Sequence, residues 1–257
     1  MMNNATPVIN LLWTGGWDST YRLLILTQKK IILQPHYIIC DRRRSVNNEL
    51  NAIEKITEDI VNDSRTKCDF LPTIIIKEAD IPPNEEITNA FNRIRQQVLI
   101  GPQYEYLSRY AHTVGNLEIG IEKGGLAEDM INKFGKINYV DKDGLSYWEL
   151  DRSASSEDLI TVFGGFRFPI YTMSKLDMKE EAEKLGVMEI MEKTWFCHFP
   201  YKGLPCGSCF PCKFTIEDGL AYRLPKKALR RYKTEKKFGK YKIYQRMKRL
   251  RRKWLHY

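Results

Sequence analysis

Short apolar runs alternate with longer amphipathic stretches along the first half of the chain. Four of these runs predict strands, at residues 8–13, 36–40, 73–77 and 117–121. Three longer stretches predict helices, at residues 19–30, 47–62 and 87–113. The last stretch is long enough for one helix, or for two helices around Gly101 and Pro102. Strands that alternate with helices favour a parallel sheet covered on both faces, so we expect an α/β, doubly wound fold.

The pattern is less regular after residue 121. Residues 122–165 contain two glycine pairs and a short aromatic run, and they support no assignment of elements. Residues 168–171 lead into a helix that is expected over 172–185. Ser174 and Asp177 have the spacing of a capping box, and Gly186 suits the end of that helix.

The composition is that of an ordinary globular protein. The 257 residues are 43% hydrophobic and 28% charged, which is sufficient for one sizeable core. No apolar run approaches the roughly 20 residues that span a bilayer. The first residues also lack the basic and apolar regions of a signal peptide. We therefore expect a cytoplasmic protein without a membrane partner.

Positive charge is concentrated at the C-terminal end. Residues 226–257 contain fifteen Lys or Arg and one acid, whereas the whole chain has a net charge of +9. Aromatic residues are interleaved with these charges, and four apolar residues fall at helical spacing, namely Ile243, Met247, Leu250 and Trp254. The pattern predicts a basic amphipathic helix. It would contact nucleic acid, dock on a protein partner, or form a solvated terminus.

These features suggest two domains. The first is expected at 1–222 and includes a metal-binding element at 195–213. The second is a basic tail at 223–257.

The first predicted strand ends abruptly at the sequence TGGWDST, residues 14–20. A loop between a parallel strand and a helix presents backbone N–H groups and the positive end of the helix dipole, which together bind anions. Glycine at 15 and 16 would let the backbone approach a phosphate, and the nearby hydroxyls could donate hydrogen bonds. The loop has no Walker A lysine and is not GxGxxG. The alternative is a tight turn in which Ser19 caps the helix.

Four cysteines lie within sixteen residues, with the spacing C-x8-C-x2-C-x2-C, at Cys197, Cys206, Cys209 and Cys212. Four thiolates so spaced can converge tetrahedrally on Zn²⁺, although an iron–sulfur cluster uses the same ligands. Four closely spaced cysteines in a chain without an export signal favour metal over disulfides. A closed set of four thiolates leaves no position for substrate, so the predicted role is structural.

The loop resembles the SGGxDS motif of the PP-loop ATP pyrophosphatases, with Thr14 in place of the first serine. That family has the adenine nucleotide alpha hydrolase-like fold and cleaves ATP between its α and β phosphates. The resemblance implies that ATP and Mg²⁺ bind at Thr14, Gly15, Gly16, Asp18, Ser19 and Thr20. It further implies catalytic roles for Asp18 and Ser19, with Asp18 on the metal or as a cap. Gly120 is expected near the base or the ribose.

The order of the later motifs resembles the 7-cyano-7-deazaguanine synthase family of queuosine precursor biosynthesis. The motifs are FPI at 168–170, SKL at 174–176, LGV at 185–187, and the cysteines of TWFCH and CGSCFPC. The resemblance implies a homodimeric ligase that binds Zn²⁺ and activates a small-molecule carboxylate, 7-carboxy-7-deazaguanine or a related acid. An amine or ammonia would then give an amide or a nitrile, with release of AMP and pyrophosphate.

The chain departs from that family at the region expected to bind the acceptor. Gly101-Pro102-Gln103 stands where the family has Gly-Arg-Asn, and Glu122-Lys123-Gly124-Gly125 replaces an aromatic and acidic segment. Glu122, Lys123 and Arg167 are candidates to meet the acceptor. Two alternatives stay open: a tRNA-modifying sulfur transferase that uses Cys40 or Cys68, and a catalytically degenerate protein that binds a nucleotide or a partner.

Overall fold

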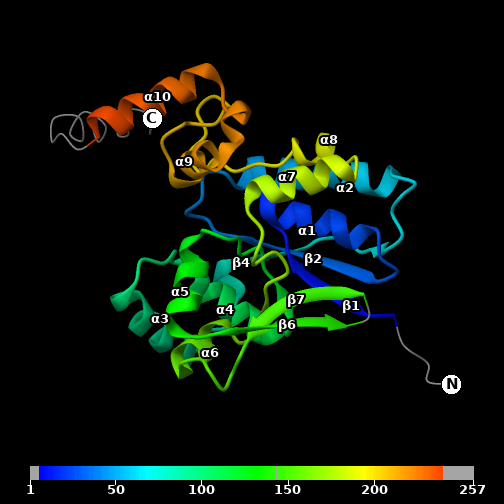
Figure 1. The fold of residues 1–257 in the computed structure, drawn as a ribbon, viewed down its shortest axis with the longest axis vertical. Coiled ribbons are helices and arrows are strands. Elements are labelled where there is room, and N and C mark those ends of the chain that lie inside the picture. Colours follow the sequence, from blue (N-terminus) through cyan, green and yellow to red (C-terminus); the bar gives the residue numbers. More distant parts are fainter. Residues whose placement is uncertain (1–5, 143, 240–257) are drawn as a thin grey trace. The chain divides into compact units, whose positions relative to one another are not determined.

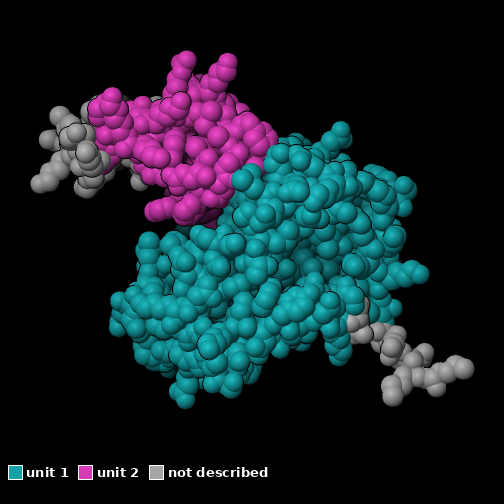
Figure 2. Space-filling model, in the orientation of Figure 1, with its two compact units in different colours: residues 1–42, 46–195 teal, residues 43–45, 196–257 magenta. Residues whose placement is uncertain are grey.

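The computed structural model describes residues 6–142 and 144–239, and its contacts divide the chain into two compact units. Unit 1 comprises Met1–Arg42 and Val46–Trp195, and unit 2 comprises Arg43–Ser45 and Phe196–Tyr257 (Figure 2).

Unit 1 is built on a sheet whose strands pair in parallel, in the order β3-β2-β1-β5-β8, with β4 also paired to β2. Its strands are β1 (Val8–Leu12), β2 (Ile32–Ile39), β3 (Asp69–Phe70), β4 (Ile74–Lys77), β5 (Leu117–Glu118) and β8 (Phe166–Arg167). The central strand β1 is almost continuously apolar, as expected of a strand covered on both faces.

Helices cover both faces of this sheet (Figure 1). One layer contains α1 (Trp17–Thr27), α2 (Val46–Asn62), α7 (Lys175–Lys184) and α8 (Met188–Met191). The other contains α3 (Glu85–Gln97), α4 (Gln103–Val114), α5 (Leu126–Phe134) and α6 (Glu157–Phe163). The expected α/β class with a parallel sheet is confirmed. The stretch at 87–113, which left one helix or two open, contains two helices, because α3 ends before Gly101 and Pro102 and α4 follows them.

Residues 122–165, for which the sequence supports no assignment, contain α5, α6 and an antiparallel hairpin. The hairpin is formed by β6 (Ile137–Lys142) and β7 (Leu145–Leu150). Residues 166 and 167 form the parallel strand β8, and Phe168 forms an antiparallel bridge with Trp148 of β7. A short 3-10 turn (Glu78–Asp80) follows β4.

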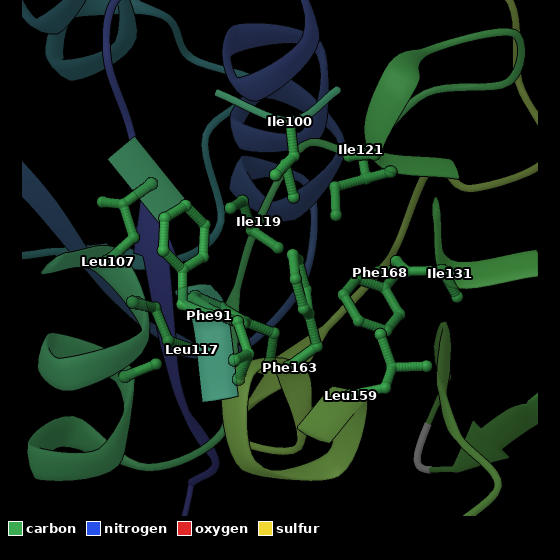
Figure 3. Packing of buried hydrophobic residues seen from close by; sticks show 14 of the residues in the cluster. Phe91, Ile100, Leu107, Leu117, Ile119, Ile121, Ile131, Leu159, Phe163 and Phe168 are labelled. Atoms are coloured by element: carbon green, nitrogen blue, oxygen red, sulfur yellow. The ribbon is translucent and has the colours of Figure 1, made fainter. Parts of the chain in front are cut away.

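One apolar cluster of unit 1 lies between the sheet and the layer of α3 to α6. Phe163 is fully buried, with its ring centroid 6.5 Å from that of Phe168, and Phe91 of α3 packs into the same cluster (Figure 3). Strand β5 contributes Leu117, and Ile119 follows on the same face. Glu118, between them, points to the opposite face because side chains alternate along a strand.

Unit 2 contains α9 (Phe210–Thr215), a π-turn (Ile216–Leu220), a 3-10 turn (Ala221–Arg223) and α10 (Lys226–Phe238). The cysteine segment therefore groups with the basic helix, whereas the sequence-based division placed it in the first domain. The expected apolar positions at Ile243, Met247, Leu250 and Trp254 lie outside the described residues. Within the described part of the chain, none of the helices is both long and apolar enough for a membrane span.

A buried histidine links the sheet of unit 1 to one of its helix layers. His36 of β2 is 3% exposed, and its Nε2 lies 3.0 Å from Asn10 Oδ1 on β1. Its Nδ1 lies 2.7 Å from the hydroxyl of Tyr110 on α4. The network is satisfied when Nε2 donates to Asn10 and Nδ1 accepts from Tyr110, which is the neutral imidazole. Burial lowers the pKa of His36 from 6.5 to about 4.

This histidine makes the protein less stable in acid. Between pH 6.5 and 4, His36 is protonated in the unfolded chain but neutral in the folded chain. The free energy of unfolding therefore falls as the pH is lowered through this range. The full effect is about 3 kcal/mol. Urea unfolding of the wild type and of His36→Gln at pH 7.5, 6.5, 5.5 and 4.5 should show a steeper decline for the wild type. Parallel curves would contradict the assignment.

Candidate functional site

A sharp glycine bend joins strand β1 to helix α1. Gly15 has φ +65, a left-handed conformation that favours glycine. A Cβ at this position would lie 3.1 Å from the carbonyl oxygen of Glu49 and 3.2 Å from the Ile53 side chain, both on α2. The Gly15 carbonyl accepts a 2.8 Å hydrogen bond from the backbone N–H of Trp195. Both the conformation and the close packing therefore require glycine here.

Helix α1 begins at this bend without a side-chain cap. Its N-cap residue is Gly16, which is extended and offers no side-chain oxygen to the first N–H groups. The Ser19 hydroxyl instead lies 3.4 Å from the backbone nitrogen of Thr14 and 3.5 Å from its hydroxyl. The alternative in which Ser19 caps the helix is therefore wrong. An uncapped helix N-terminus behind a glycine bend can bind an anion.

One predicted loop residue, Thr20, is part of the packing inside unit 1. Thr20 is fully buried, and its Oγ1 accepts a 3.0 Å hydrogen bond from the indole nitrogen of Trp13. Its position is in the packing between β1 and α1, which differs from the phosphate contact expected from the sequence.

The bend lies where the sheet changes direction. From β1 the chain passes through α1 to β2 on one side, whereas β5 pairs with β1 on the other side. In open parallel sheets, ligands bind in the crevice outside the carboxyl ends of the strands at such a switch point.

Gly120, just after β5, lies against the start of α1. A Cβ on Gly120 would lie 3.2 Å from Cβ of Asp18 and 3.3 Å from the backbone nitrogen of Ser19. Glycine thus permits the segment after β5 to approach the start of α1 closely. The structure thus brings Gly120 to the loop, whereas its place near the base or the ribose stays a prediction.

Three charged side chains meet beside the bend. The ammonium of Lys175, the first residue of α7, contacts the carboxylate of Glu122 and lies 3.4 Å from Asp18 Oδ1. The Lys175 side chain is only 9% exposed. Its place is set by the capping box of Ser174 and Asp177, which is confirmed. Asp18 Oδ1 is buried and makes no hydrogen bond among the described residues.

The two carboxyl groups share an environment that disfavours two negative charges. Burial and then the adjacent charge of Asp18 raise the pKa of Glu122 to about 9, and Lys175 only partly offsets them. The pair therefore disfavours two negative charges in the absence of a bound cation. Carboxylate oxygens are ligands that Mg²⁺ prefers, and a bound cation would favour the ionised form of both groups.

The other two candidates for the acceptor make contacts outside the group of Asp18, Glu122 and Lys175. Lys123 is exposed and its backbone N–H donates to the carbonyl of Met173. The guanidinium of Arg167 lies 4.3 Å from the ring centroid of Tyr147 on β7.

Sequence reasoning missed Lys175 as a site residue. The SKL motif contains residue 175 only as part of the family pattern, and nothing local to residue 175 reveals that α7 begins opposite Asp18. The buried ion pair between Arg22 of α1 and Glu118 of β5 was also missed, because its partners are 96 residues apart.

The four predicted metal ligands come together in unit 2. The sulfur atoms of Cys197, Cys206, Cys209 and Cys212 all lie within 4.8 Å of one another, and all four residues are buried. Two sulfur pairs, 206 with 212 and 197 with 209, are 3.9 Å apart. A tetrahedral ion with metal–sulfur bonds of about 2.3 Å has sulfur–sulfur edges of roughly 3.8 Å. These residues can therefore hold a metal ion.

Backbone groups support the cluster. The N–H groups of Ser208 and Cys209 point at the sulfur of Cys206, at 3.4 and 3.3 Å, and the N–H of Cys206 points at the sulfur of Cys197. Hydrogen bonds from the other three cysteines hold the pKa of Cys206 well below its usual range. Such donors stabilise thiolates and orient them toward a metal.

Comparisons of the chain with models of known families and with curated proteins gave no match.

We expect the purified protein to contain one metal ion per chain at this cluster. Cys206→Ser should abolish metal retention and lower the free energy of unfolding by several kcal/mol, because binding of a structural ion contributes directly to folding. Elemental analysis and thermal unfolding measure the two effects. Cys68→Ser is the matched control, since Cys68 is buried in unit 1 outside the cluster. Equal metal content in both variants would rule out the assignment.

Proposed function

We propose that this protein is a PP-loop enzyme that activates a carboxylate with ATP and passes the acyl group to ammonia or an amine. The observation that carries the proposal is the uncapped start of α1 behind the Gly15 bend, at the switch point of a parallel sheet. The TGGWDS motif and the position of Gly120 support the same assignment. The proposed acid is 7-carboxy-7-deazaguanine or a related compound.

In the proposed reaction the chain binds the β and γ phosphates of ATP at the loop. Backbone N–H groups at the start of α1 and the hydroxyls of Thr14 and Ser19 would donate to them. These groups are fixed before the reaction, and donors preorganised toward developing charge contribute strongly to rate. Asp18 and Glu122 would hold Mg²⁺ through carboxylate oxygens, and the ion would neutralise phosphate charge.

The chemistry consists of two displacements. A carboxylate oxygen of the substrate attacks the α phosphorus, which forms an acyl adenylate and breaks the bond to the β phosphate, so pyrophosphate leaves. The nitrogen of ammonia then attacks the acyl carbon, loses a proton and expels AMP to form an amide. Lys175 would balance the charge of Asp18 beside the departing pyrophosphate, because it is held against that carboxylate in a nearly buried position. A second activation of the amide oxygen would give a nitrile.

The cysteine cluster is proposed to hold Zn²⁺ in a structural role. Its four sulfur ligands suit a closed tetrahedral site with no open position for substrate.

The sulfur-transfer alternative gains no support from the remaining cysteines. Both Cys40 and Cys68 are buried, and burial raises the pKa of the Cys68 thiol. A persulfide carrier requires an accessible thiolate.

Isotope transfer tests the adenylation step. The full-length protein is incubated with ATP, Mg²⁺, ammonium and 7-carboxy-7-deazaguanine labelled with ¹⁸O in its carboxylate. The account predicts AMP that carries one ¹⁸O, because the attacking oxygen stays with phosphorus when the acyl group leaves. AMP and the amide or nitrile are identified by mass spectrometry. Unlabelled AMP would indicate hydrolysis, and absence of AMP with this and related acids would leave a degenerate nucleotide-binding protein.

The loop is tested by the double variant Asp18→Ala/Ser19→Ala. We expect pyrophosphate release to fall at least about a hundredfold, since loss of a single preorganised donor has an effect of that size. Asp69→Asn is the matched control, because Asp69 is exposed on β3, which pairs with the beginning of β2. Release at the normal rate from the double variant would remove the loop from the mechanism.

A further inference from the structure

Helix α10 of unit 2 has one buried side and one strongly basic side. Ala228 and Tyr232 are 2% and 8% exposed, one helical turn apart. Four exposed cations follow one another at spacings of four, three and four residues, namely Lys226, Arg230, Lys233 and Lys237. At about 100° per residue they fall within roughly 60° of the helix circumference, opposite the buried side. We call these four residues the basic stripe.

The cysteine segment holds α10 in this orientation. The guanidinium of Arg231 donates to the carbonyl oxygen of Cys206, one of the cluster residues. Gly207 has φ +72, and a Cβ there would lie 2.2 Å from the carbonyl oxygen of Ala228. The first turns of α10 (Figure 1) therefore pack directly on the turn between two cysteines. The cysteine cluster and the helix that carries the basic stripe therefore pack directly against each other.

The nearby acids do not neutralise the stripe. Glu217 accepts a 2.6 Å hydrogen bond from the hydroxyl of Tyr232, and Glu235 pairs with Lys213 at 2.8 Å. Within residues 196–239, ten Lys or Arg stand against three acids. Among the residues that the structure describes, no member of the stripe forms an ion pair. The stripe is therefore a row of cations that face solvent.

We propose that the basic stripe binds the phosphodiester backbone of a single-stranded nucleic acid. A row of cations along a helix matches the repeated charge of such a strand, which supplies most of the affinity of sequence-independent binding. Unit 2 also exposes Phe210 and Phe214 of α9, at 68% and 42%, with ring centroids 6.2 Å apart. Exposed aromatic rings are surfaces on which unpaired bases stack.

An anionic membrane is the less suitable polyanion. A helix that lies in a membrane interface buries an apolar face among the lipids. The apolar side of α10 is already used, because Ala228 and Tyr232 pack inside unit 2. The proposal does not depend on the proposed enzymatic reaction, since none of its residues belongs to the loop of unit 1.

The test measures how affinity depends on salt. Full-length protein is titrated into fluorescein-labelled single-stranded RNA and DNA of 20 nucleotides, at 50 to 300 mM NaCl, and binding is followed by anisotropy. The variant K226Q/R230Q/K233Q/K237Q keeps good helix formers and removes four charges. The association constant falls with salt, and each lost phosphate contact makes the slope of log K against log salt less steep by about 0.7. The variant should therefore show a slope whose magnitude is smaller by roughly 3.

A matched variant controls for net charge. K29Q/K30Q/K55Q/K67Q removes four exposed cations from unit 1 and should leave affinity and slope unchanged. Circular dichroism and metal content verify that unit 2 is intact, and R230Q/K233Q, with an expected slope change of about 1.4, serves if the fourfold variant does not fold.

Binding of RNA, DNA or both with the expected slopes supports the proposal, and the two probes show which sugar is accepted. Three results would overturn it: no salt-dependent binding by the wild type, equal slopes for the wild type and the stripe variant, or an equal loss in the control variant. Retention on vesicles of phosphatidylserine and phosphatidylcholine, without binding of either strand, would assign the stripe to membranes instead.

Discussion

The buried ion pair between Arg22 and Glu118 fixes the geometry on which the candidate site depends. Two nitrogens of Arg22 contact the two oxygens of Glu118 at 2.7 and 2.8 Å, and the residues are 5% and 1% exposed. A bidentate pair of this kind defines both distance and orientation. Because it joins α1 to β5, it aligns the start of α1 with the segment that follows β5. Loss of one partner would leave an uncompensated buried charge, at a cost of about 3–5 kcal/mol.

Two features of the candidate site follow from this alignment. Gly120 can approach Asp18 and Ser19 closely, which places the end of β5 against the loop. Glu122, two residues further on, reaches the same space as Asp18. Lys175, placed by the capping box of α7, meets the same two carboxyl groups from a third segment. The ion pair thus acts through position, because it brings the end of β5 to the start of α1.

Local sequence signals predicted the alternation of strands and helices, the glycine bend and the convergence of the cysteines. Each depends on patterns within about twenty residues, where periodicity and turn chemistry are decisive. Contacts between segments that are distant in the sequence could not be predicted from such local patterns. The hairpin of β6 and β7, the bridge from Trp148 to Phe168, and the approach of Lys175 to Asp18 all join distant segments. The burial of Thr20 was also not predicted. The motif alone does not distinguish a hydroxyl that contacts a ligand from one that bonds inside the protein, and the Thr20 hydroxyl accepts from the indole of Trp13.

The most direct measurement is a crystal structure of the full chain with Mg²⁺ and an ATP analogue whose α and β phosphorus atoms are joined by a methylene group. The account predicts the two terminal phosphates on the N–H groups at the start of α1, with the ion against Asp18 and Glu122. A nucleotide bound at another place, with the bend from Thr14 to Gly16 unoccupied, would contradict it.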